Sequence, residues 1–155
     1  MTMIISAHLG DCILIASDKR SMHCDLETGN MRLATDEEQK IKLWCRGAIA
    51  GSGETVFLNR IAQHFMDIQE DETQLNQMDV IYEEIEKRVL EDIPQKILSR
   101  NVIIFSMFDG QKTVLYSIPI EPFFQTFQED DVYKIHPYMN EITEGSGITF
   151  ATGTP

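Results

Sequence analysis

The sequence MTMIISAHLGDCILIASD, residues 1–18, contains two short apolar runs separated by a turn. The runs cover residues 3–7 and 12–16, and Leu9-Gly10-Asp11 lies between them. Apolar runs of this length on either side of a glycine-containing turn are typical of a β-hairpin. Because both runs are almost continuously apolar, we expect neither face of this hairpin to be exposed to water.

The composition is that of a single globular domain with an acidic surface. Of the 155 residues 43% are hydrophobic, and 25 acidic residues against 13 basic ones give a net charge of −12. Binding to nucleic acid phosphates requires a basic surface, so nucleic acid is not an expected partner. No apolar run approaches the ~20 residues of a membrane span, so no membrane partner is expected either.

The cysteines and histidines suggest neither disulfides nor a metal site. Cys12, Cys24 and Cys45 are an odd number without paired spacing, and two of them lie in apolar runs, where a thiol behaves as a small hydrophobic group. These features predict a cytoplasmic protein. The four histidines lack metal-ligand spacing and the Gly51-Ser-Gly53 segment is an incomplete dinucleotide motif, so we expect no metal or cofactor.

After the hairpin the chain predicts strands followed by two consecutive helices. Short strands are predicted at residues 31–35, 40–44 and 48–50 from alternating or apolar patterns. A helix is predicted from Glu54 to residue 68, because its apolar residues recur at helical spacing. The connection 69–76 is polar.

The second helix is predicted over residues 78–92, with Ile81, Ile85 and Val89 on its buried stripe. Pro94 ends the helical pattern, because proline lacks the N–H and disfavours a helical residue before it.

The last part of the chain predicts strands again. Residues 102–108 and 113–119 form an apolar hairpin around Asp109-Gly110, and further strands are predicted at 132–135 and 148–151. Because the helices are consecutive and do not alternate with strands, we expect an α+β fold with antiparallel sheets, in one domain over residues 1–155.

Thr2 lies directly behind the initiator methionine, at the start of the first strand. If Met1 is removed, Thr2 combines a hydroxyl nucleophile with an α-amine base whose ordinary pKa is about 7.7–8.0. Such a site also needs a cation, a carboxylate to hold it, and backbone N–H groups facing the developing oxyanion. Asp18 and Lys40 are candidates for the carboxylate and the cation, and Gly51, before a helix N-terminus, for the backbone donor.

From Thr2 onward the chain resembles the catalytic β-type subunits of the proteasome and their bacterial relatives of the HslV type. The matching segments follow one another in the family's order, and they are Thr2-Met-Ile-Ile-Ser-Ala, Ile13-Leu-Ile-Ala-Ser-Asp18 with Lys19-Arg20, Lys40-Ile41, and the oxyanion-loop-like Ala48-Ile-Ala-Gly51-Ser-Gly53. The predicted helix pair and the hairpin at Asp109-Gly110 occur in the same order.

The resemblance implies an αββα sandwich of the N-terminal-nucleophile type and cleavage of an amide or peptide bond. Thr2 would act as nucleophile and, through its amine, as general base; Asp18 and Lys40 would tune that amine, and the Gly51 N–H would stabilise the oxyanion. Thr154 falls roughly where the family has a supporting serine. The resemblance also implies a homo-oligomer whose substrate is a peptide or a small amide.

Two departures from the family set conditions on this hypothesis. The family continues beyond the position of Pro155 with further helices and strands, so we expect a domain that lacks this C-terminal part and exposes an apolar sheet face. Retention of Met1 would leave Thr2 without a free amine. The alternative is a catalytically silent proteasome-like subunit with a structural or assembly role. The family's α-type subunits carry an extra helix before the first strand, and its absence here favours the catalytic hypothesis.

Overall fold

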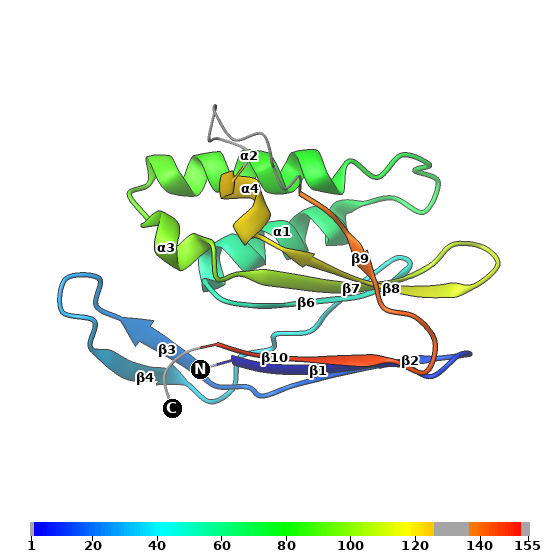
Figure 1. Ribbon diagram of the computed structural model, residues 1–155, viewed down its shortest axis with the longest axis horizontal. Coiled ribbons are helices and arrows are strands. Elements are labelled where there is room, and N and C mark those ends of the chain that lie inside the picture. Colours follow the sequence, from blue (N-terminus) through cyan, green and yellow to red (C-terminus); the bar gives the residue numbers. More distant parts are fainter. Residues whose placement is uncertain (1, 126–136, 153–155) are drawn as a thin grey trace.

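The computed structural model of this protein describes residues 2–125 and 137–152, which form three layers (Figure 1). A layer of helices covers one face of a five-stranded sheet, and a three-stranded sheet lies against the other face. The helices of the described residues are α1 (Thr55–Asp67), α2 (Gln77–Leu90), α3 (Gln95–Leu98) and α4 (Glu121–Gln125).

Every strand pairing in the described residues is antiparallel. The central sheet has the order β5-β6-β7-β8-β9, comprising β5 (Lys42–Trp44), β6 (Gly47–Ser52), β7 (Val102–Phe108), β8 (Thr113–Pro119) and β9 (Asn140–Glu141). The outer sheet has the order β10-β1-β2, comprising β1 (Thr2–His8), β2 (Ile13–Ser17) and β10 (Gly147–Thr152). A separate hairpin pairs β3 (Ser21–Cys24) with β4 (Met31–Thr35).

The central sheet is buried on both faces, and alternation along β7 separates two hydrophobic clusters. Ile103 and Phe105 pack into the cluster beneath the helices, whereas Ile104 packs with Ile4 of β1 between the sheets. Side chains of successive strand residues point to opposite faces, so one strand serves both clusters. These alternating apolar residues explain why β7 reads as a continuous apolar run.

The His8 side chain forms a hydrogen bond between the two sheets. Its Nε2 lies 3.0 Å from the Thr113 carbonyl oxygen on β8, and its Nδ1 accepts a hydrogen bond of 3.1 Å from the Gly10 N–H. Because Nδ1 is an acceptor, Nε2 is the nitrogen that donates to Thr113.

The N-terminal hairpin is confirmed, but the prediction that both of its faces are buried is wrong. Met3, Ile5 and Leu14 are 42%, 43% and 53% exposed. They point away from the central sheet, and the described residues place no helix over that face. These residues therefore supply a helix layer and two sheet layers, without a second helical layer.

The helices occupy the predicted segments, with one error in the buried stripe of α2. Val89 is 46% exposed, and the buried residues are Ile81, Ile85 and Arg88. The buried stripe therefore follows the spacing i, i+4, i+7, and the predicted stripe through Val89 follows i, i+4, i+8. Both spacings lie on one face of a helix, so the prediction depended on Val89 being apolar and Arg88 being charged.

Other predictions from polar or mixed segments need correction. The strand β3 and the short elements α3, α4 and β9 were not predicted. All three cysteines are exposed, including the two that were expected in apolar surroundings. The strand expected at 132–135 lies outside the described residues. None of the described helices has both the length and the apolar character required to cross a membrane.

Candidate active site

The β1–β2 hairpin brings the carboxylate of Asp18 next to the start of the chain. The Met3 N–H donates to Asp18 Oδ1 at 3.0 Å, and the Asp18 N–H donates to the Met3 carbonyl at 3.2 Å. Thr2 begins β1, and Asp18 directly follows β2. The pairing of two adjacent antiparallel strands therefore fixes the position of Asp18 relative to Thr2.

Lys40 places its ammonium group between these two residues. Its Nζ lies 2.9 Å from Asp18 Oδ1 and donates to Thr2 Oγ1 at 3.3 Å. The Lys40 side chain is 9% exposed, and that of Asp18 is 35% exposed. A nearly buried ammonium needs a counter-ion, and Asp18 supplies it.

The protonation state of Asp18 suits this role. Burial raises the pKa of its carboxyl, but hydrogen bonds from the Met3 N–H and the Lys40 ammonium, together with the charge of Lys40, outweigh burial and hold the pKa below its ordinary value of 3.8. Asp18 is therefore an anion at neutral pH.

Gly51 shares a cleft with Thr2 and Lys40. The cleft has a volume of about 470 Å³, counting its open mouth, and lies between the edge of the central sheet and α1. The pairing of β5 with β6 ends at Lys42 opposite Ile49, so Gly51 lies beyond the end of the edge strand. Among the described residues, no strand pairs with this edge of β6 at Gly51, where it meets the cleft.

Several cleft residues were not identified from the sequence as site residues. They are Glu38 and Lys42 near the sheet edge, and Thr55, Leu58 and Asn59 at the start of α1. Lys42 lies in a segment of alternating polar and apolar residues, and nothing in this local pattern distinguishes a solvated lysine from one that lines a cleft. Thr154 lies outside the described residues.

Of the predicted site residues, Thr2, Lys40 and Gly51 line the cleft, and Asp18 pairs with Lys40. The Lys40 ammonium lies within hydrogen-bond distance of both the Thr2 hydroxyl and the Asp18 carboxylate. Such a group can lower the cost of forming an alkoxide on the hydroxyl, because the cation stabilises the negative charge.

The fold has known counterparts, although no protein-family model and no curated protein matches the sequence. A Gly-1 mutant of Anbu from Hyphomicrobium sp. strain MC1 matches 99% of this chain at 14% identity, with a TM-score of 0.58. A second Anbu structure from that organism matches 96% of the chain at 14% identity, with a TM-score of 0.54. BPH from Thiobacillus denitrificans, in complex with epoxomicin, matches the whole chain at 15% identity, with a TM-score of 0.54.

These neighbours have proteasome-like folds of the N-terminal-nucleophile type. At this level of identity the likeness is one of fold. The matched region covers 62% and 60% of the two Anbu chains and 74% of the BPH chain. This chain thus spans less than two thirds of the length of Anbu.

Proposed function

We propose that this chain hydrolyses amide or peptide bonds with Thr2 as the nucleophile, once Met1 has been removed. The observation that supports this most directly is the position of Lys40 Nζ, 3.3 Å from Thr2 Oγ1 and 2.9 Å from Asp18 Oδ1. A cation there stabilises a developing alkoxide and favours the neutral form of a nearby amine. The fold neighbours, one of them bound to epoxomicin, support a proteasome-like hydrolase.

The proposed reaction has two steps that share one oxyanion site. Thr2 Oγ attacks the carbonyl carbon while the α-amine of Thr2 takes the hydroxyl proton, and the Gly51 N–H faces the oxyanion. The proton then passes to the leaving nitrogen, the C–N bond breaks, and an ester remains on Thr2. Water attacks this ester, and the amine again moves the proton, which releases a carboxylic acid and regenerates Thr2.

Intact mass spectrometry of the purified protein, before and after incubation with epoxomicin, tests this proposal. We expect a mass without Met1 and a further gain equal to one epoxomicin molecule, together with cleavage of fluorogenic peptide amides. Thr2→Ala should abolish both labelling and cleavage. Thr149→Ala is the matched control, because Thr149 is an exposed threonine of β10 outside the lining of the cleft, and it should retain both.

Three outcomes would contradict the proposal. A protein that retains Met1 has no free amine on Thr2 and cannot use this mechanism. Labelling that survives in Thr2→Ala would assign the reaction to another residue. A protein that has lost Met1 but neither reacts with epoxomicin nor cleaves amides would favour the structural or assembly role.

We also expect the chain to form a homo-oligomer. The exposed apolar residues Met3, Ile5 and Leu14 lie together on the outer face of the β10-β1-β2 sheet, and exposed apolar patches favour association. Light scattering after size-exclusion chromatography should give a mass above that of the 17.8 kDa chain. A monodisperse monomer at high concentration would refute this expectation.

A further inference from the structure

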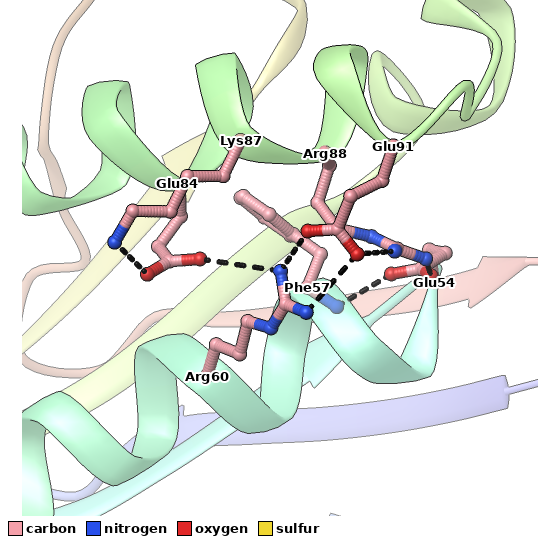
Figure 2. A network of polar contacts seen from close by, with 7 residues as sticks. All are labelled: Glu54, Phe57, Arg60, Glu84, Lys87, Arg88 and Glu91. Atoms are coloured by element: carbon pink, nitrogen blue, oxygen red, sulfur yellow. Dashed lines mark hydrogen bonds and ion pairs between the residues drawn. The ribbon is translucent and has the colours of Figure 1, made fainter.

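A buried arginine on α2 lies close to the turn that carries Gly51 into α1. Arg88 occupies a core-facing position of α2, and its side chain is 8% exposed. A guanidinium group in such a position destabilises the protein unless it is paired. Arg88 is paired on both sides, through Nη2 with Glu54 Oε1 and through Nη1 with Glu91 Oε2, the latter at 2.9 Å (Figure 2).

The ion pairs of Arg88 do not satisfy all of its buried hydrogen-bond donors. The buried Arg88 Nε has no hydrogen-bond partner among the described residues. A buried charge pair with an unsatisfied donor is seldom better for stability than an apolar residue of similar size. The two helices are also joined nearer the surface, because Arg60 on α1 contacts Glu91 at 2.5 and 3.1 Å. The distinct feature of Arg88 is therefore its contact with Glu54.

Glu54 is held at both its side chain and its backbone. One carboxylate oxygen pairs with Arg88, and the other accepts a hydrogen bond from the Phe57 N–H, which makes Glu54 the N-cap of α1. The Glu54 N–H donates to Asn101 Oδ1 at 2.7 Å. Asn101 is fully buried, and its Nδ2 donates to the Leu98 carbonyl at 2.8 Å, so its own orientation is fixed.

The short turn between the cleft and Glu54 packs closely against its neighbours. Gly53 has a φ of +139°, and a Cβ at this position would collide with the Asn101 side chain. A Cβ on Gly51 would collide with the Leu58 side chain. The segment from Gly51 to Glu54 is thus packed against α1 on one side and against Asn101 on the other.

We propose that Arg88 and Asn101 are positioning residues that fix the Gly51–Glu54 turn, and with it the Gly51 N–H in the cleft. This inference rests on the proposed function, in which that N–H faces the oxyanion. An oxyanion donor contributes to catalysis only when it is held in place before the charge forms. A misplacement of about 1 Å can cost as much as ~100-fold in rate, even when the mutated residue does not touch the substrate.

The central comparison is between Arg88→Met and Arg60→Met. Both changes remove a guanidinium that pairs with Glu91, but only Arg88 also pairs with Glu54. With a fluorogenic peptide amide, we expect Arg88→Met to lower kcat by about 10- to 100-fold while KM stays within about twofold. Arg60→Met should leave both constants unchanged. Arg88→Lys, which keeps a cation opposite Glu54, should recover part of the lost kcat.

A second measurement follows the turn itself and does not require activity. Amide hydrogen exchange by NMR at Gly51, Ser52 and Gly53 should be faster in Arg88→Met than in the wild type, and unchanged in Arg60→Met. If Arg88→Met does not fold, Glu54→Gln tests the same contact, because it keeps the capping side chain and removes its charge. Asn101→Leu removes the other anchor and should act on kcat and exchange in the same direction.

The outcomes separate this inference from the proposed function. An unchanged kcat in folded Arg88→Met and Glu54→Gln, or an equal loss in Arg60→Met, would overturn the positioning role. If the wild-type protein lacks Met1 and is inactive, the proposed function fails alone. Exchange at Gly51–Gly53 then decides whether Arg88 holds the turn: unchanged exchange in Arg88→Met refutes it, and faster exchange supports it.

Discussion

The two faces of the central sheet are buried by different kinds of layer. Beneath the helices the buried cluster contains both aliphatic and aromatic side chains, and its Trp44, Phe65 and Phe105 rings meet with centroids 5.1 to 6.4 Å apart. Between the sheets the buried cluster is smaller and consists of aliphatic residues, Ile4, Ala50, Ile104, Leu115 and Ile142. The helix side is thus thick and interlocked, whereas the sheet side is thin and is closed by strands whose other face is exposed.

This difference bears on where the candidate active site lies relative to the two buried clusters. The candidate active site lies at the end of the thin layer, where β1 and β2 contribute Thr2 and Asp18. Its proposed oxyanion donor, Gly51, belongs to β6 of the central sheet, which lies between the two layers. The site is therefore assembled from residues of the outer-sheet hairpin and of the central sheet, beside the start of α1.

The largest effect should come from two neighbouring isoleucines of β7. Ile103 faces the helices and Ile104 the outer sheet, and they are 1% and 0% exposed. Replacing a buried isoleucine by alanine costs about 2–5 kcal/mol, and the cost is greatest where the surroundings cannot close the cavity. We expect Ile103→Ala to fall near the top of this range and Ile104→Ala near the bottom, measured by urea unfolding. Equal losses would show that the two layers are equally rigid, and reversed losses would show that the sheet side is the more rigid one.

A smaller contrast should separate the two faces of the outer sheet. On β2, Ile15 packs against the inter-sheet cluster, whereas Leu14 is 53% exposed. At a protein concentration low enough for the chain to be monomeric, Ile15→Ser should lower the free energy of unfolding by roughly 1–3 kcal/mol, and Leu14→Ser by no more than about 0.5 kcal/mol. Urea unfolding of both variants at one protein concentration checks this. If Leu14→Ser proved as destabilising as Ile15→Ser, the outer face would have to be covered in solution.

The contact that joins Thr2, Asp18 and Lys40 should contribute in a pH-dependent manner. The pKa of Asp18 lies below its ordinary value of 3.8 in the folded protein, so its carboxylate stabilises the fold above that pH, and the contribution is lost as the pH falls through the folded pKa. Asp18→Asn should cost about 1–2 kcal/mol at pH 7, including the penalty of leaving Lys40 unpaired.

The measurement for Asp18 is the difference in urea midpoint between wild type and Asp18→Asn at pH 7 and at pH 3. This difference should shrink at the lower pH, because the wild-type carboxyl begins to take up a proton there. A difference that stayed constant over this interval would contradict the assigned charge state of Asp18.

The smallest effects should come from two buried serines on the sheet faces. Ser6 is 1% exposed, and its Oγ has no hydrogen-bond partner among the described residues, whereas Ser106 Oγ accepts from the Ala48 N–H at 3.0 Å. Ser6→Ala should leave stability unchanged or raise it slightly, and Ser106→Ala should lower it by about 1 kcal/mol. Thermal unfolding of the pair tests this; a clear loss in Ser6→Ala would reveal a partner for its hydroxyl.

Local patterns were sufficient to predict most of the fold and the centre of the candidate site. The first hairpin, both long helices and the β7–β8 hairpin follow from apolar periodicity and glycine turns, which are properties of short segments. The approach of Asp18 to Thr2 follows from the hairpin alone. The contact of Lys40 with both residues matches the resemblance, which supplied a long-range relation that the local pattern lacks.

The features that were missed depend on partners distant in sequence. The exposure of Leu14 depends on what covers the outer sheet, which the hairpin's own residues do not encode. Arg88 was passed over for Val89 because its burial depends on Glu54, 34 positions earlier. Similarly, β3 is polar and mixed, and it is a strand because β4 pairs with it.

Ser52 at the end of β6 pairs with Val102 at the start of β7. The chain therefore leaves the sheet to form the helices and re-enters it at a neighbouring position. Asn101 joins the two ends of the helical segment, because its Oδ1 accepts a hydrogen bond from the Glu54 N–H. The connection between α1 and α2, residues 68–76, can therefore change in length at a small cost in loop entropy, without displacing the strands. Insertions within residues 52–54 or 99–102 would move these two ends apart. Variation in chain length should thus be tolerated at the far end of the helices and excluded at their base, beside the cleft.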